Sequence, residues 1–214
     1  KQFPLKQDFS GLTDNIDDVN EFVKNCNLAQ TKVNLDNEIK FLKTHHAFWR
    51  NGNYAFTDLE NTLGVIHIIR DPRNVITSVF NHFNIDSYAH ALEFMKDPLQ
   101  CIGVKGGESG HDLMTIISSW GNHYSSWKKF KKNNLLIKYE NLINNPEKEF
   151  VKLCNFIEDI SDLKFEKKLI LKAIESCNFN TLKKQEASNG FSEGTTNKAN
   201  IKNEFFNLGP ENDW

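Results

Sequence analysis

Hydrophobic and polar positions along the chain predict strands that are separated by helices. Residues 64–69 form an apolar run rich in β-branched side chains, which is typical of a buried strand. Residues 135–139 form a second short apolar run of the same kind. Strands that alternate with helical segments indicate an α/β fold, with a central parallel sheet flanked by helices.

Several other segments have a regular spacing of apolar residues. Apolar residues recur at helical spacing in residues 87–95, 113–130, 146–157 and 163–176, and more weakly in residues 19–26. Residues 39–44 alternate apolar and basic side chains and predict a short strand. Residues 97–112 are rich in glycine and predict a long loop, which in compact domains is usually a lid or a disordered segment.

The junction after the first apolar run carries the strongest local signal. Arg70 ends the run, Asp71 is suited to cap a helix, and Pro72 is suited to its first turn. Arg70 is therefore expected at the carboxyl end of a strand, where open α/β sheets bind their ligands. Ser78 follows two turns into the helix. A guanidinium and a hydroxyl in these places indicate a phosphate site.

Composition narrows the classes of protein that fit. With 214 residues and 39% hydrophobic side chains, the chain is long enough for one core, so we expect a single domain over residues 1–214. A formal net charge of -2 argues against a general nucleic-acid binder. No apolar run approaches the roughly 18 residues of a membrane span, and no secretory signal is visible.

Cysteine and histidine positions predict neither disulfides nor a metal site. The 4 cysteines are widely spaced without a CxxC pair, which is typical of a reduced, cytoplasmic protein. The histidines include no convincing pair at metal-ligand spacing, and His67 is expected in the core. Lys43 and His45 share a face by the period-two rule, while His46 points the other way. Taken alone, such a Lys-x-His pair is typical of a solvent-facing strand end.

Short motifs in a fixed order resemble the sulfotransferase superfamily, whose members use 3′-phosphoadenosine 5′-phosphosulfate as the sulfuryl donor. They are FLKTH at residues 41–45, IRDPRNVITS at 69–78, IKYENL at 137–142 and FFNLGPENDW at 205–214. The last is similar to the family's FFRKGxxGDW element. The resemblance runs from about Ile39 to Trp214 and implies a three-layer, P-loop-like α/β fold.

The resemblance also implies a donor site. Arg70 and Ser78 match residues that hold the 3′-phosphate of the donor, and Tyr139 matches a tyrosine close to the nucleotide. Cys177 and Phe179 match a segment that lines the adenine, on which the phenyl ring can stack. An ordinary core role for Phe179 remains an open alternative.

The closing motif departs from the family at three positions, of which Asn212 in place of glycine is the mildest change, because asparagine tolerates left-handed backbone geometry. The family's Arg-Lys-Gly triplet reads Asn207-Leu208-Gly209 here, so two cations are missing. The backbone amides of Leu208 and Gly209 remain as donors to the 3′-phosphate.

The resemblance assigns the chemistry to two residues. His45 matches the general base, and an imidazole is suited to take a proton near neutral pH. Lys43 would stabilise charge on the donor phosphate as the sulfuryl group leaves. The acceptor is then a small-molecule or glycan hydroxyl, or an amine. No metal is implied, and the resemblance is compatible with a homodimer.

One family element has no counterpart in this sequence. Residues 1–38 contain nothing like the phosphosulfate-binding loop that precedes the KTH motif in the family. Because the chain begins at Lys1 rather than Met, we expect it to be truncated at its N-terminus, with that loop upstream. Two alternatives stay open: a catalytically silent nucleotide-binding relative, and a P-loop nucleotide kinase, although no GxxxxGK[ST] motif is present.

Overall fold

The computed structural model describes residues 1–103, 113–191, 193–196 and 203–211. The chain divides into two compact units, each assembled from separate stretches of sequence. The first unit is Lys1–Val65 with Phe94–Asn134, and the second is Ile66–Glu93 with Leu135–Trp214. The predicted single domain is not tested by this division and stays a prediction.

The first unit combines helices with short strand pairs. Its elements are η1 (Lys6–Phe9), α1 (Val19–Val33), β1 (Arg50–Asn51), β2 (Tyr54–Ala55), β4 (Cys101–Ile102), β5 (Thr115–Ile116) and α4 (Trp120–Trp127). Strand β1 pairs with β2, and β4 pairs with β5, both antiparallel. Asp18 caps α1 by accepting from the backbone nitrogens of Asn20 at 2.8 Å and Glu21 at 3.1 Å.

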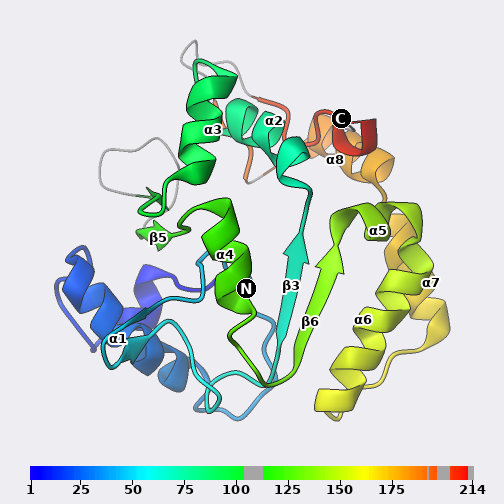
Figure 1. Cartoon of the computed structure of the whole chain (residues 1–214). Coiled ribbons are helices and arrows are strands. Elements are labelled where there is room, and N and C mark those ends of the chain that lie inside the picture. The colour runs from blue at the N-terminus through cyan, green and yellow to red at the C-terminus, as the bar shows by residue number, and fades with distance from the viewer. Residues whose placement is uncertain (104–112, 192, 197–202, 212–214) are drawn as a thin grey trace. The chain divides into compact units, whose positions relative to one another are not determined.

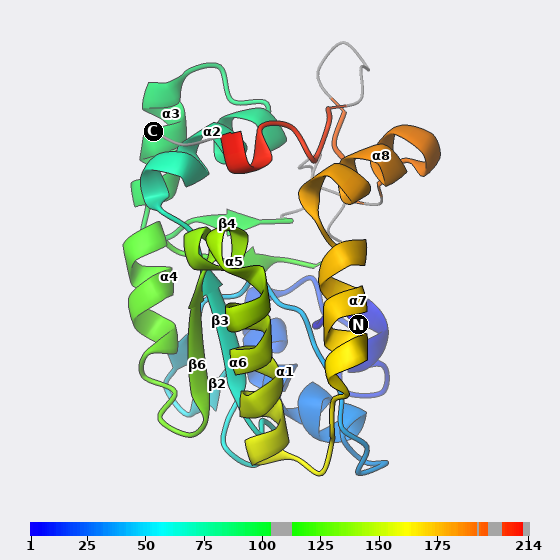
Figure 2. The same cartoon turned by 90° about the vertical axis from the view of Figure 1, so that its right-hand side faces the viewer.

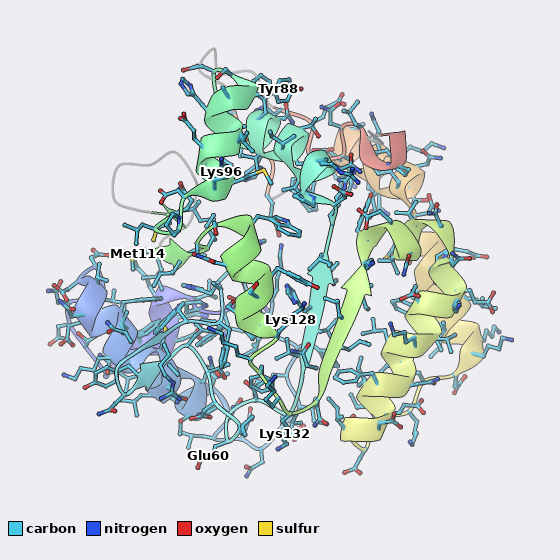
Figure 3. The ribbon with its side chains drawn as sticks, in the orientation of Figure 1. Glu60, Tyr88, Lys96, Met114, Lys128 and Lys132 are labelled. Atoms are coloured by element: carbon cyan, nitrogen blue, oxygen red, sulfur yellow. The ribbon has the colours of Figure 1, made fainter. Side chains whose placement is uncertain are left out.

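Aromatic side chains dominate the core of the first unit. Its buried members are Phe3, Phe9, Phe22, Val23, Cys26, Ala29, Phe56, Leu113, Trp127 and Phe130. Phe22 and Phe56 each stack with the buried His46 ring, at centroid distances of 5.6 and 4.7 Å. Helix α4 contributes Trp127 to this core. Lys128 follows the last residue of the helix (Figure 3), and its Nζ lies 4.0 Å from the centroid of the Tyr124 ring.

The second unit is built on a parallel strand pair. Strands β3 (Val65–Ile69) and β6 (Asn134–Lys138) are neighbours and run in the same direction (Figure 1). The helices are α2 (Pro72–His82), α3 (Tyr88–Lys96), α5 (Tyr139–Asn144), α6 (Pro146–Ile160), α7 (Lys167–Ser176), α8 (Phe179–Asn189) and the short η2 (Gly209–Glu211). Helices α6 and α7 pack side by side (Figure 2). Both strands and α3 begin in one unit and end in the other.

The predicted α/β class with a parallel sheet and flanking helices is confirmed. Its local signals are visible at the helix starts: Asp71 caps α2 and Pro72 occupies its first turn. Pro146 likewise opens α6. Strand β3 is less buried than expected, because Ile68 is 57% exposed, while His67 is buried as predicted.

Two predicted elements are wrong. Residues 39–44 form no strand; only Lys43 makes an isolated parallel bridge, to Gln2. The helix expected over residues 113–130 is much shorter, because the β-branched Thr115 and Ile116 pair as strand β5. Ser118 then turns the chain at a φ of 59°, and Ser119 caps α4 by accepting from the Asn122 backbone nitrogen at 3.2 Å.

The glycine-rich segment is only partly described. Cys101–Ile102, expected within the loop, forms strand β4 instead. Residues 104–112, which carry the predicted lid, lie outside the described residues. Among the helices that the structure describes, none is both long and apolar enough to cross a membrane.

Candidate active site

Arg70 lies directly after β3, as predicted, and the next residues fix the chain there. The Asp71 side chain accepts from the Arg73 backbone nitrogen at 2.9 Å, and its own backbone nitrogen donates to Glu140 at 2.7 Å. The guanidinium of Arg73 donates two hydrogen bonds to the Asp71 carboxylate, from Nε at 2.9 Å and from Nη2 at 2.6 Å. This bidentate contact, more than the backbone contact, lowers the pKa of Asp71 to about 2.

The guanidinium of Arg70 faces a different set of groups. Its carbon lies 4.4 Å from the centroid of the Tyr139 ring, the first residue of α5. Its Nη2 donates to the Gly209 carbonyl at 3.0 Å. Tyr139 follows β6, so the carboxyl ends of the two parallel strands and the tail segment meet at this arginine. A cation held on an aromatic face keeps its planar donors in a fixed orientation.

Phe179 and Gly209 are in close contact. Gly209 has a φ of +53°, and a Cβ built there would lie 2.2 Å from Cε2 of Phe179. Only a residue without a side chain allows the tail to pass this close to the ring. The structure thus brings together four predicted site residues: Arg70, Tyr139, Phe179 and Gly209.

The remaining predicted donor residues lie in the same unit but are exposed. Ser78 is exposed on α2, and Leu208 is 44% exposed in the tail. Cys177 is an exposed free thiol after the last residue of α7, with its sulfur 3.8 Å from the Ser176 hydroxyl. The roles of these three residues in donor binding stay predictions.

Lys43 and His45 belong to the first unit, and they follow the predicted alternation. Both are exposed, whereas His46 between His45 and Ala47 is 1% exposed. The segment belongs to no strand and makes only the isolated bridge between Lys43 and Gln2. The backbone of Lys43 accepts from the Phe3 nitrogen at 2.9 Å and donates to the Lys1 carbonyl at 2.8 Å.

His46 fixes the chain next to the candidate base. Its Nδ1 accepts from the Ile116 backbone nitrogen at 3.2 Å and from Trp49 Nε1 at 3.3 Å. Its carbonyl accepts from Trp127 Nε1 at 3.0 Å. The sequence placed His46 on the opposite side from His45, and the structure shows why: His46 is part of the core.

His123 on α4 is a residue that the sequence reasoning missed. Burial lowers the pKa of His123, and hydrogen bonds to the main chain of His45 and His46 oppose that shift. The helical period of residues 113–130 predicted a helix there but did not single out this histidine. His123 lies one helical turn before the core residue Trp127, and this position was the signal from which its burial could have been predicted.

A metal site finds no support in the described part of the chain. It contains no group of three or more His, Cys, Asp or Glu side chains that could hold an ion.

Comparison with known proteins identifies the family. A family model described as the sulfotransferase domain matches residues 10–214. Among solved structures, the chain aligns with mouse sulfotransferase SULT7A1 complexed with PAP at 23% identity and a TM-score of 0.41, over 56% of this chain and 40% of that one. No match was found among curated proteins. Because the family model spans nearly the whole sequence, the chain belongs to the sulfotransferase domain family.

Proposed function

We propose that this protein transfers a sulfuryl group from 3′-phosphoadenosine 5′-phosphosulfate to a hydroxyl or amine of a small molecule or glycan. The observation that carries the proposal is the position of the Arg70 guanidinium. It follows the end of β3, lies over the Tyr139 ring and donates to the Gly209 carbonyl in the tail. Membership of the sulfotransferase domain family supports the same reaction class.

Arg70 provides the main charge for the donor's 3′-phosphate. Its Nη2 donates to the neutral carbonyl of Gly209, 3.0 Å away. A phosphate oxygen is a stronger acceptor than a carbonyl, because the hydrogen bond is then charged on both sides. The Ser78 hydroxyl and the amides of Leu208 and Gly209 complete this subsite. Cys177 and Phe179, two residues apart in sequence, line the adenine, on which the Phe179 ring stacks.

His45 and Lys43 carry the transfer step. The acceptor hydroxyl attacks the donor sulfur in line, and its proton passes to the imidazole of His45. The bond between sulfur and the bridging oxygen breaks, and the electron pair leaves on the 5′-phosphate of the nucleotide. Lys43 compensates that charge from the same exposed side of the segment. We assign no metal to the reaction, and we place it in the cytoplasm because all 4 cysteines are free thiols.

Binding of adenosine 3′,5′-bisphosphate and of 5′-AMP, measured by calorimetry, tests the donor site. The two ligands differ only in the 3′-phosphate. We expect the bisphosphate to bind more tightly and Arg70→Ala to remove that preference. Arg73→Ala is the matched control, since this guanidinium is committed to Asp71. Equal binding of the two ligands by the wild-type protein would overturn the proposal.

Transfer of labelled sulfate from the donor to a panel of phenols, alcohols and amines tests the catalytic roles. His45→Ala should lower the rate about 10²–10⁴-fold. The exposed His90 on α3 provides the control, His90→Ala, which should leave the rate unchanged. Bisphosphate binding without any turnover would instead identify a silent nucleotide-binding relative, and tighter binding of ATP would indicate a kinase.

A further inference from the structure

Helix α8 presents three side chains to the tail of the chain. Phe179, Lys183 and Glu186 are spaced by four and three residues, which places them on one side of the helix. All three contact residues 204–209. The sequence reasoning did not predict this helix and assigned no role to Lys183 or Glu186.

Glu186 holds the tail backbone. Its Oε1 accepts from the Phe205 backbone nitrogen at 2.8 Å, and its Oε2 accepts from that of Phe206 at 2.9 Å. The rings of these two residues pack around Phe191, at centroid distances of 4.6 and 5.2 Å. These contacts hold Phe205 and Phe206 in place, and the chain continues from them to Asn207.

Lys183 contacts the tail at Asn207, the residue after Phe206. Its Nζ donates to the Asn207 carbonyl at 3.2 Å and lies 6.0 Å from the centroid of the Phe179 ring. It is also 3.5 Å from Glu204, whose side chain is 66% exposed. An exposed ion pair of this kind contributes little, so the ammonium can exchange it for a stronger partner.

Two cations thus converge on one short piece of backbone that has no cation of its own. Lys183 donates to the carbonyl of Asn207, and Arg70 donates to that of Gly209. Consecutive Cα atoms are about 3.8 Å apart, so these two positions are separated by no more than about 7.6 Å. These two carbonyls are neutral, and a phosphate oxygen is a stronger acceptor than either of them.

We propose that Lys183 is a second cation of the 3′-phosphate site and supplies charge that residues 207 and 208 lack. This inference rests on the proposed function. The half-exposed lysine side chain, 44% accessible, turns from the Asn207 carbonyl to the phosphate of the bound donor. The Glu186 carboxylate lies nearby, but both of its oxygens accept backbone N–H groups, which lowers the repulsion that it exerts on an anion.

The test compares Lys183→Met with Lys184→Met, its sequence neighbour on the same helix. Calorimetry with adenosine 3′,5′-bisphosphate and with 5′-AMP separates the 3′-phosphate contact from the rest of the nucleotide. We expect Lys183→Met to weaken bisphosphate binding about tenfold and to leave 5′-AMP binding unchanged. Lys184→Met should bind both ligands as the wild type does, and Lys183→Arg should retain most of the bisphosphate affinity.

The outcomes distinguish this inference from the proposed function. If Arg70→Ala removes the preference for bisphosphate while Lys183→Met keeps full affinity, the role of Lys183 is wrong and the donor site stands. Equal weakening of both ligands by Lys183→Met would also contradict it, because a general disturbance of the tail has that effect. If the wild-type protein shows no preference for bisphosphate, the proposed function itself fails.

Discussion

Gly209 has a positive φ, which favours glycine, and it lies against a ring, which leaves no room for a side chain. At a φ of +53° any other L-residue is strained, by roughly 1–2 kcal/mol for alanine. A methyl group would in addition overlap the Phe179 ring, 2.2 Å from the Cβ position. The ring or the tail must move, and the carbonyl that accepts from Arg70 moves with it.

Gly209→Ala should therefore weaken adenosine 3′,5′-bisphosphate binding about tenfold, while the thermal midpoint changes little because the tail is at the surface. Calorimetry and a melting curve measure the two effects. Gly121→Ala is the control: that glycine lies within α4 with no atom within 4 Å of its Cβ position, so alanine should be neutral or slightly stabilising. Unchanged affinity in Gly209→Ala would show that the tail contributes nothing to nucleotide binding.

The residues of the candidate site differ in how far the sequence revealed them. Arg70 was identified because its neighbours follow a local rule for the end of a strand and the start of a helix. Lys183, Glu186 and His123 were missed, because their partners lie far along the chain. Glu186 contacts Phe205 and Phe206, and His123 contacts the main chain of His45, so only folding brings these groups together.

At the scale of elements, the start of α2 depends on Asp71 as its cap. Asp71→Ala removes both the cap and the partner of Arg73, and we expect it to lower the free energy of unfolding by about 1 kcal/mol at neutral pH. Urea unfolding measures the loss. Asp71→Asn keeps an acceptor for the Arg73 backbone nitrogen but not the charge, so it should lose less.

The pH dependence of this loss follows from the lowered pKa of Asp71. In the folded chain Arg73 lowers the pKa to about 2, against the ordinary 3.8. The unfolded chain binds more protons between these values, so the stabilisation is present above about pH 4 and declines as the pH falls towards 2. The difference between wild type and Asp71→Asn should shrink over that range. A difference that stays constant with pH would mean that the Arg73 contact contributes no stability.

The elements also show where local patterns mislead. Residues 113–130 have the spacing of one long helix, but Thr115 and Ile116 pair with β4 instead. Residues 39–44 have the alternation of a strand, yet only Lys43 finds a backbone partner. Period and propensity describe which side of a segment is buried, while strand pairing depends on a neighbour that the local sequence does not contain.

At the scale of the whole molecule, the two units share elements of secondary structure. The divisions fall within β3, α3 and β6, so each unit contains part of all three. Neither unit can unfold alone without breaking these elements. We therefore expect one cooperative transition in scanning calorimetry, with equal calorimetric and van't Hoff enthalpies.

Phe22→Ala strengthens this test, because Phe22 is 1% exposed in the core of the first unit. Its removal should cost about 3–5 kcal/mol and lower the midpoint of the whole transition. Leu35→Ala, at a residue that is 74% exposed, is the control and should change the midpoint little. Two separate transitions, of which only one responds to Phe22→Ala, would contradict the expected single domain.

The sequence by itself determined the α/β class, the capped start of α2, the position of Arg70 after its strand and the shared side of Lys43 and His45. Each of these depends on residues within a few positions of one another, where φ/ψ preferences and side-chain direction act directly. The tertiary structure alone decided that Arg70 meets Tyr139 and Gly209, that His46 lies in an aromatic core and that Lys183 approaches Asn207. These contacts join residues that are distant in sequence, and packing of the whole chain selects them.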